Sequence, residues 1–146
     1  MATNTYTALL TQTLSTATST IDFTSISGAY TDLIIVTNHA YTATDQIQIR
    51  VGNGTIDTGT NYSATTLQGS GTTASSSRQT SSSFIYDIFG TSTNDGNNSI
   101  IHFMNYANTT TYKTTLSRGN SLGDSTNAVV GLWRSTSAIN LSLIHI

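Results

Sequence analysis

The residues able to do acid–base or nucleophilic chemistry are three histidines, seven aspartates and many serines. The histidines, His39, His102 and His145, each lie within or at the end of a strand-like pattern, and most aspartates stand beside glycine, asparagine or threonine, where aspartate caps turns. A Ser–His–Asp set can be drawn in any chain so rich in serine, and the chain has no Gly-x-Ser-x-Gly elbow. We therefore expect no catalytic residues and no enzymatic activity. A hydrolase remains the alternative only if the fold brings histidine and aspartate side chains together in a cleft.

Metal and phosphate sites are equally weakly indicated. The segments "DTGTN" (57–61) and "NDGNN" (94–98) offer oxygen ligands, but neither has the spacing of an EF-hand loop or its terminal glutamate. The chain contains no cysteine, which excludes disulfides and thiolate metal sites. No lysine follows the glycine-rich stretches as a Walker loop requires. We expect neither a metal nor a cofactor.

Exposed loop side chains are better candidates for a binding role. The chain has seven tyrosines and one tryptophan, and aromatic rings beside amides and carboxylates can stack on sugars and bond their hydroxyls. Most aromatics fall within strand patterns and should fill the core, namely Phe84, Tyr86, Phe103, Tyr106 and Trp133. The candidates for a glycan or partner contact are therefore Tyr41, Tyr62, Asp57, Asn61 and Arg134.

The segment "GNGTIDTGTNYS" (52–63) has two interpretations. Its glycines and asparagines permit the positive φ of a tight reversal, and its Asp and Thr side chains can cap the turn, so we predict a connection between strands. A binding site in the same segment is the alternative.

The composition predicts an all-β protein without nucleic-acid or membrane partners. Only 8% of residues are charged, glutamate is absent, and Ser, Thr and Asn make up roughly two-fifths of the chain. Threonine suits a pleated, half-wet surface. Five Lys plus Arg and a net charge of −2 are too few cations for a phosphate-binding face. The N-terminal "MATNTYTALLTQTL" lacks the pattern of a signal peptide, and no apolar run approaches the length of a transmembrane helix.

Apolar residues alternate over short segments separated by turn-rich clusters, which predicts a single antiparallel β-sandwich or jelly-roll-like domain over 1–146. The segment 30–41 is apolar on both faces and predicts a central strand. The Ser/Thr/Gly-rich segment 69–83 predicts a flexible loop or an arm that a partner orders. The predicted strands cover 5–14, 19–26, 30–41, 46–51, 61–68, 83–89, 99–107, 111–117, 128–134 and 138–146.

Three stretches together resemble a small β-sandwich module of tailed-phage virion proteins, seen in marine and freshwater phages. They are "YTDLIIV" (30–36), "QIQIRVGNGTIDTGTNYS" (46–63) and "GLWRSTSAIN" (131–140), and the resemblance covers most of the chain in order. It implies a structural role in the virion: a capsid decoration, cement or adaptor protein or, alternatively, a tail-fibre module that binds a host surface glycan or receptor. No catalytic residue is established for that family.

The resemblance also implies partners. Other virion proteins and further copies of the chain, in a homo-oligomer such as a trimer, are the expected ones, and the virion is the expected location, reached from the host cytoplasm. Relatives continue past "AIN" into a further hairpin, whereas this chain stops at "LSLIHI" and starts at Met1 almost directly with the module. We therefore expect a stand-alone module whose last strand leaves an edge for strand addition by a neighbour, formed by Leu141, Leu143, Ile144 and Ile146.

Overall fold

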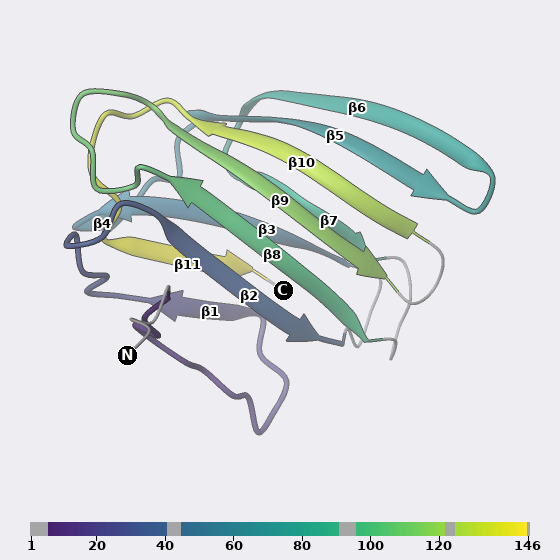
Figure 1. The fold of residues 1–146 in the computed structure, drawn as a ribbon, viewed down its shortest axis with the longest axis horizontal. Coiled ribbons are helices and arrows are strands. Elements are labelled where there is room, and N and C mark those ends of the chain that lie inside the picture. The colour runs from purple at the N-terminus through teal and green to yellow at the C-terminus, as the bar shows by residue number, and fades with distance from the viewer. Residues whose placement is uncertain (1–5, 41–44, 91–95, 122–124, 146) are drawn as a thin grey trace, which may run out of the picture.

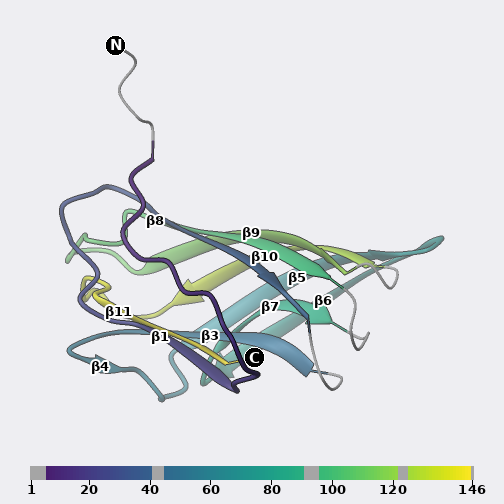
Figure 2. The ribbon, with the colours of Figure 1, turned by 90° about the horizontal axis from the view of Figure 1, so that it is seen from below.

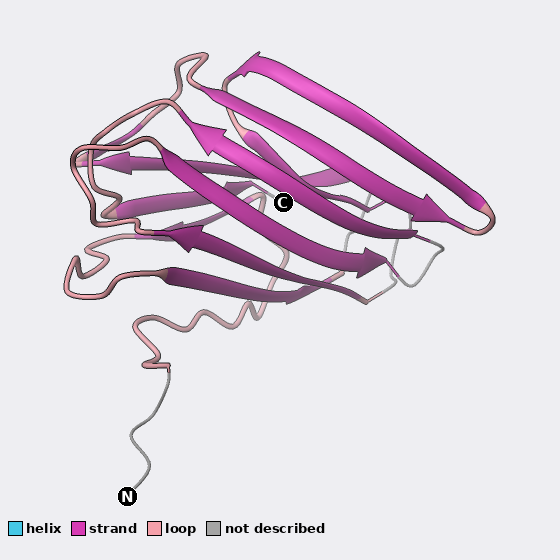
Figure 3. Cartoon of the chain, turned by 45° about the horizontal axis from the view of Figure 1, so that its top comes forward, coloured by secondary structure: helices cyan, strands magenta, loops and turns pink. Residues whose placement is uncertain are grey.

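The computed structural model describes residues 6–40, 45–90, 96–121 and 125–145. These residues form eleven β-strands and no helix, so the all-β class predicted from the composition is confirmed (Figure 3). Accordingly, no helix within these ranges is long and apolar enough to cross a membrane. All strand pairs are antiparallel, and they make two sheets that lie face to face (Figures 1 and 2).

The smaller sheet is built around β3. Its order is β1, β11 and β3, and β4 and β7 both pair with the second edge of β3 at different points along it. β11 is hydrogen-bonded to β1 on one side and to β3 on the other. The bounds are β1 (Thr20–Phe23), β3 (Asp45–Asn53), β4 (Thr55–Ile56), β7 (Ile85–Gly90) and β11 (Leu141–His145).

The larger sheet has six strands in the order β2, β8, β9, β10, β5 and β6. Its two edge strands are β2 and β6, and the β5–β6 hairpin projects beyond the neighbouring strands at the right of Figure 1. The bounds are β2 (Leu33–His39), β5 (Tyr62–Ser70), β6 (Thr73–Ser82), β8 (Asn97–Met104), β9 (Lys113–Ser121) and β10 (Ser125–Trp133).

The core fills the space between the sheets, and period-two alternation puts it there. Ile47, Ile49 and Val51 of β3 are each at most 1% exposed, as their alternation predicts. From the larger sheet, alternate residues of β8 and β10 point inward to meet them. The sheets lie close together at Gly131 of β10, where an added Cβ would lie 2.9 Å from Cγ2 of Ile85 in β7. The largest fully buried side chains include Tyr62, Phe103, Tyr106, Ile101, Ile139 and Ile144.

Two secondary-structure predictions differ from the structure. The segment 69–83, predicted as a flexible loop or an arm that a partner orders, contains β6, which pairs with β5 of the same chain. A two-residue turn joins the strands, and Gly71 adopts a φ of +55° there. The N-terminal segment is predicted as a strand over 5–14, but its described residues, 6–14, do not form one. Threonine favours strands, but a strand also needs a hydrogen-bonded neighbour, and residues 6–14 have none.

Two predictions about strand position are also wrong. The strand within 30–41, β2, is an edge strand and not a central one, and its Val36 is 71% exposed. The strand-addition edge predicted at Leu141, Leu143 and Ile144 does not exist, because both sides of β11 are already paired within the chain. Ile146, the fourth residue of that prediction, lies outside the described residues.

Candidate functional site

Four of the five residues predicted as glycan or partner contacts come together where β4 leads into β5. Asp57 lies at their centre and accepts three hydrogen bonds through its carboxylate. Its Oδ2 accepts from Trp133 Nε1 at 2.7 Å and from Asn61 Nδ2 at 2.9 Å, and its Oδ1 accepts from Gly59 N at 2.8 Å. Desolvation raises the pKa of Asp57, but these three hydrogen bonds outweigh it and leave the pKa below its usual value.

Tyr62 is part of the core and not an exposed contact. Its side chain is 0% exposed, and its ring stacks on that of Trp133 with centroids 6.4 Å apart. The hydroxyl accepts a hydrogen bond from Val51 N at 3.1 Å and lies 3.0 Å and 2.9 Å from the carbonyls of Val51 and Asp57, to which it can donate. Burial raises the pKa of Tyr62 to about 12. The prediction of an exposed Tyr62 is wrong because this residue opens β5 on its inward side.

Arg134 belongs to the same cluster. Its guanidinium donates to the carbonyls of Thr60 at 3.0 Å and Tyr62 at 3.2 Å, and its backbone N–H donates to Asn61 O. The polar groups of the cluster are therefore largely bonded to one another. We interpret segment 52–63 as a connection whose side chains hold β3, β5 and β10 together, which was the first of the two interpretations. Tyr41, the fifth predicted contact, lies outside the described residues.

A histidine and an aspartate do meet elsewhere, at the start of β2. His102 Nε2 lies 3.0 Å from Asp32 Oδ2, and both side chains are more than one-third exposed. Asp32 Oδ1 accepts from Asn105 N at 2.8 Å, and this bond is the main reason that the pKa of Asp32 is lowered. In a catalytic arrangement His102 would also hydrogen-bond to a nucleophilic side chain. Among the described residues, His102 has no hydrogen bond other than the one to Asp32. Within the same ranges, no three acidic or histidine side chains cluster as metal ligands.

The outward face of the six-stranded sheet carries the most unusual feature of the surface. Four of its aliphatic side chains are at least half exposed: Val36 at 71%, Leu67 at 61%, Val130 at 56% and Leu116 at 50%. The strand register brings them together with further outward residues that are half-buried. We call this set the outer patch, and its members are Ile34, Val36, Leu67, Ile100, Leu116, Val130 and Leu132.

The outer patch is continuous because its residues stand in cross-strand rows. One row runs Ile34, His102, Leu116, Val130, Thr65 and Arg78, and the next runs Val36, Ile100, Arg118, Ala128, Leu67 and Ser76. Leu132 extends the patch into a third row. Five strands spaced about 4.8 Å apart and three rows about 6.8 Å apart give an area of about 490 Å², which also contains polar positions such as His102, Thr65 and Arg118. Large exposed patches rich in apolar residues are often interaction sites.

The outward face of the smaller sheet is different in kind. There Asp22, Leu143 and Arg50 are cross-strand neighbours, and the Arg50 guanidinium lies 5.4 Å from the centroid of Phe84. Phe84 and Tyr86 belong to this face, where their rings meet edge to face with centroids 4.5 Å apart; they are half-buried and do not fill the core as predicted. A mixture of charges, apolar stems and rings is ordinary for a solvated sheet, so only the larger sheet presents an aliphatic face.

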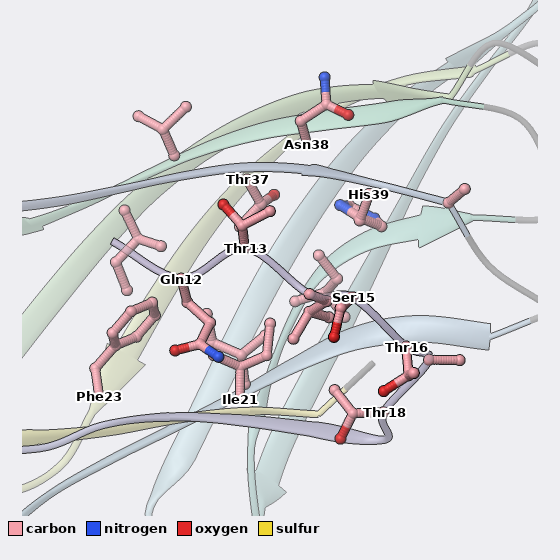
Figure 4. Close-up of a pocket in the computed structure, with 17 residues that line it drawn as sticks. Gln12, Thr13, Ser15, Thr16, Thr18, Ile21, Phe23, Thr37, Asn38 and His39 are labelled. Atoms are coloured by element: carbon pink, nitrogen blue, oxygen red, sulfur yellow. The ribbon is translucent and has the colours of Figure 1, made fainter. Parts of the chain in front are cut away.

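A second candidate site is a cleft of about 680 Å³ at the open side of the sandwich, between β1 and β2. Its lining includes the apolar side chains of Phe23, Ile35 and Ile47. Hydroxyl and amide groups of the N-terminal segment also line it, as Figure 4 shows. His39 also lines it, and burial lowers the pKa of this histidine, which favours its neutral form. Of the predicted contacts that lie within the described residues, none lines the cleft.

The outer patch was missed in the sequence, although two signals for it exist. Segment 33–36 and segment 128–132 are apolar at both positions of the alternation, and such a strand is either buried on both faces or exposes an apolar face.

Comparison with known proteins adds no further evidence, because no protein-family model, curated protein or solved structure matches the chain.

Proposed function

We propose that this chain is a non-enzymatic structural protein on the surface of a tailed-phage particle, a capsid decoration or adaptor protein that works by association. The observation that carries the association is the outer patch. Four aliphatic side chains at 50–71% exposure on one pleated face leave apolar area in water that burial against protein would remove. A chain with 8% charged residues has few other means of strong recognition.

The phage assignment is supported by the resemblance of three sequence stretches, and two of these stretches meet in the folded chain. Trp133 in "GLWRSTSAIN" bonds to Asp57 in "QIQIRVGNGTIDTGTNYS". The same two stretches also meet where Asn53 Nδ2 donates to Ala138 O at 2.9 Å and Gly54 N donates to Asn140 Oδ1 at 2.9 Å. These two stretches therefore carry residues that hold one end of the sandwich together.

The test is whether the chain occupies particles through the outer patch. Particles assembled with wild-type chain should contain it at a fixed copy number by quantitative mass spectrometry. Val130→Lys places a charge in the patch and should remove the chain from particles while circular dichroism shows the same fold. Gln48→Lys is the matched control, because it adds the same charge to the outward side of β3 in the other sheet. Particles that lack the wild-type chain, or that retain the Val130→Lys chain, would count against the proposal.

Glycan binding by a tail-fibre module is the second candidate, and the cleft between β1 and β2 is the observation that favours it. Hydroxyl and amide groups beside apolar side chains can bond sugar hydroxyls and cover a sugar face. A glycan array probed with the wild-type chain should then give saturable binding that Gln12→Ala weakens, because Gln12 is an exposed residue of the N-terminal segment that lines the cleft (Figure 4). An empty array rejects this candidate and leaves the first one untouched.

A further inference from the structure

We propose that the outward face of the six-stranded sheet binds the same face of a second copy of this chain. The twofold axis lies in the interface, parallel to the strands and between β9 and β10. This inference rests on the proposed function, since it names the partner of the same surface. The inference goes beyond the proposed function by specifying the stoichiometry and the register of the contact.

The area of the face suits such a dimer. Six strands spaced about 4.8 Å apart and four outward rows about 6.8 Å apart cover about 780 Å². A stable interface of standard size buries about 800 Å² on each partner, with an apolar centre and a polar rim. The face has that layout, because Asn38, Asn98, Asn120 and Thr126 form a polar row on one side of the outer patch.

The proposed axis makes the centre of the face complementary to itself. Rotation about it keeps each row in place and exchanges β9 with β10 and β8 with β5 of the partner. Leu116 then faces the partner's Val130, and Ile100 faces the partner's Leu67, each contact occurring twice. Arg118 faces the partner's Ala128, whose small side chain leaves room for the arginine stem. The large aliphatic residues of the four central strands thus meet one another in these rows, whereas Ile34 and Val36 of edge strand β2 lie opposite the partner's Arg78 and Ser76.

Charge complementarity at the rim favours the same axis. Among the described strands of this sheet, the outward charged residues are Arg78 and Arg118, and the acidic residue nearest this face is Asp32, directly before β2. Asp32 and Arg78 lie at opposite edges of the face, so within one chain they are far apart. The proposed rotation exchanges β2 with β6 and brings Arg78 of each chain to the Asp32 side of its partner. Such rim pairs set register more than affinity.

The other in-plane axis, perpendicular to the strands, is less favourable. It would lay each strand against itself, so that β9 meets β9, and an axis through the row of Arg118 would bring the two Arg118 side chains together. It would also leave Arg78 and Asp32 at opposite edges, with neither near an opposite charge on the partner. Like charges brought together at an interface oppose association. The placement of Arg78 near the partner's Asp32 therefore favours the axis parallel to the strands.

The first test is the oligomeric state of the full chain, measured by sedimentation equilibrium. We expect a dimer whose dissociation constant rises at least about 100-fold in Val130→Lys, because symmetry places two lysines against the partner's aliphatic residues. Gln48→Lys should leave it unchanged. A monomer at all concentrations, a trimer, or a dimer that survives Val130→Lys would overturn the inference.

The second test addresses the register. Arg78→Asp and Asp32→Arg should each weaken the homodimer, because each brings two like charges together twice. A mixture of the two variants should recover a heterodimer, in which both charge pairs are again opposite. Homodimers that persist in both variants, or a mixture without recovery, would refute the proposed axis. Asp32 also bonds to Asn105 N, so if the Asp32→Arg chain fails to fold, the Val130→Lys and Gln48→Lys comparison decides alone.

The failure of this inference can be told apart from failure of the proposed function. If the chain is monomeric but Val130→Lys still removes it from particles, the face binds another particle protein. The inference is then wrong and the proposed function stands. If the dimer forms as described but particles never contain the chain, the inference stands and the proposed function is wrong.

Discussion

Replacement of Asp57 tests whether the 52–63 segment is a structural joint. Asp57→Ala removes the carboxylate that accepts from Trp133 Nε1, a donor on a side chain that is 2% exposed. A buried donor left without its charged acceptor costs about 2–3 kcal/mol. Gly59 N and Asn61 Nδ2 also lose a partner, but both belong to exposed residues where water can replace it, at about 0.5 kcal/mol or less each. We expect Asp57→Ala to lower the free energy of unfolding by about 3 kcal/mol.

Urea denaturation followed by tryptophan fluorescence measures this directly, because Trp133 is the only tryptophan of the chain. With an m-value of about 2 kcal/mol per molar urea, the unfolding midpoint should fall by about 1.5 M. Asn61→Ala is the matched control and should change stability by about 0.5 kcal/mol or less. In a double-mutant cycle followed by circular dichroism, Asp57→Ala should cost only about 1 kcal/mol when Trp133 is already phenylalanine.

The pH dependence gives a second readout of the same bond. The pKa of Asp57 is lower in the folded chain than its ordinary value of 3.8, so the folded state favours the carboxylate. Its contribution to stability is therefore present above about pH 4 and is lost as the pH falls through the folded-state pKa. The stability difference between the wild type and Asp57→Asn should shrink over that range. An Asp57→Ala chain within 0.5 kcal/mol of wild type, at about pH 7, would refute the reasoning.

Two further substitutions test the packing of the core. Gly131→Ala should cost about 2 kcal/mol, because its Cβ would press on Thr115 Oγ1 and lie 2.9 Å from Ile85 Cγ2. Gly69→Ala, whose nearest neighbour would be 3.6 Å away, should be close to neutral, and thermal unfolding of the two variants compares them. Tyr62→Phe should cost about 1–3 kcal/mol, since the N–H of Val51 loses its bond to the buried hydroxyl, and an unchanged urea midpoint would contradict this.

The strands were predictable where alternation is strong, and less so where polar residues form strands. The alternation of Ile47, Ile49 and Val51 with polar residues predicted strand β3 and its buried side, and the structure confirms both. β6 could not be recognised, because its sequence "TASSSRQTSS" has no apolar side. It forms a strand because it pairs with β5, which ends only a two-residue turn before β6 begins.

The candidate site was harder to predict, because exposure depends on pairing between distant segments. Tyr62 follows a turn-like stretch and was expected at the surface, but its position opposite Trp133 in the β5–β10 ladder turns it inward. Val36 was expected inside because its strand is apolar on both faces, yet no second layer covers the outward side of β2. Sequence patterns showed which residues are apolar and left open which sheet face would be covered.

The tip of the β5–β6 hairpin offers a place to graft foreign peptides. Gly71 in its turn has a positive φ, and an added Cβ there would meet nothing within 4 Å. The side chains of β6 near the tip are exposed on both sides, so lengthening the turn displaces no core residue. Loop length adds only slowly to the entropy of closing the turn, about 0.6 kcal/mol per doubling. An epitope inserted between Gly71 and Thr72 would be displayed away from the body of the sandwich, once on every copy.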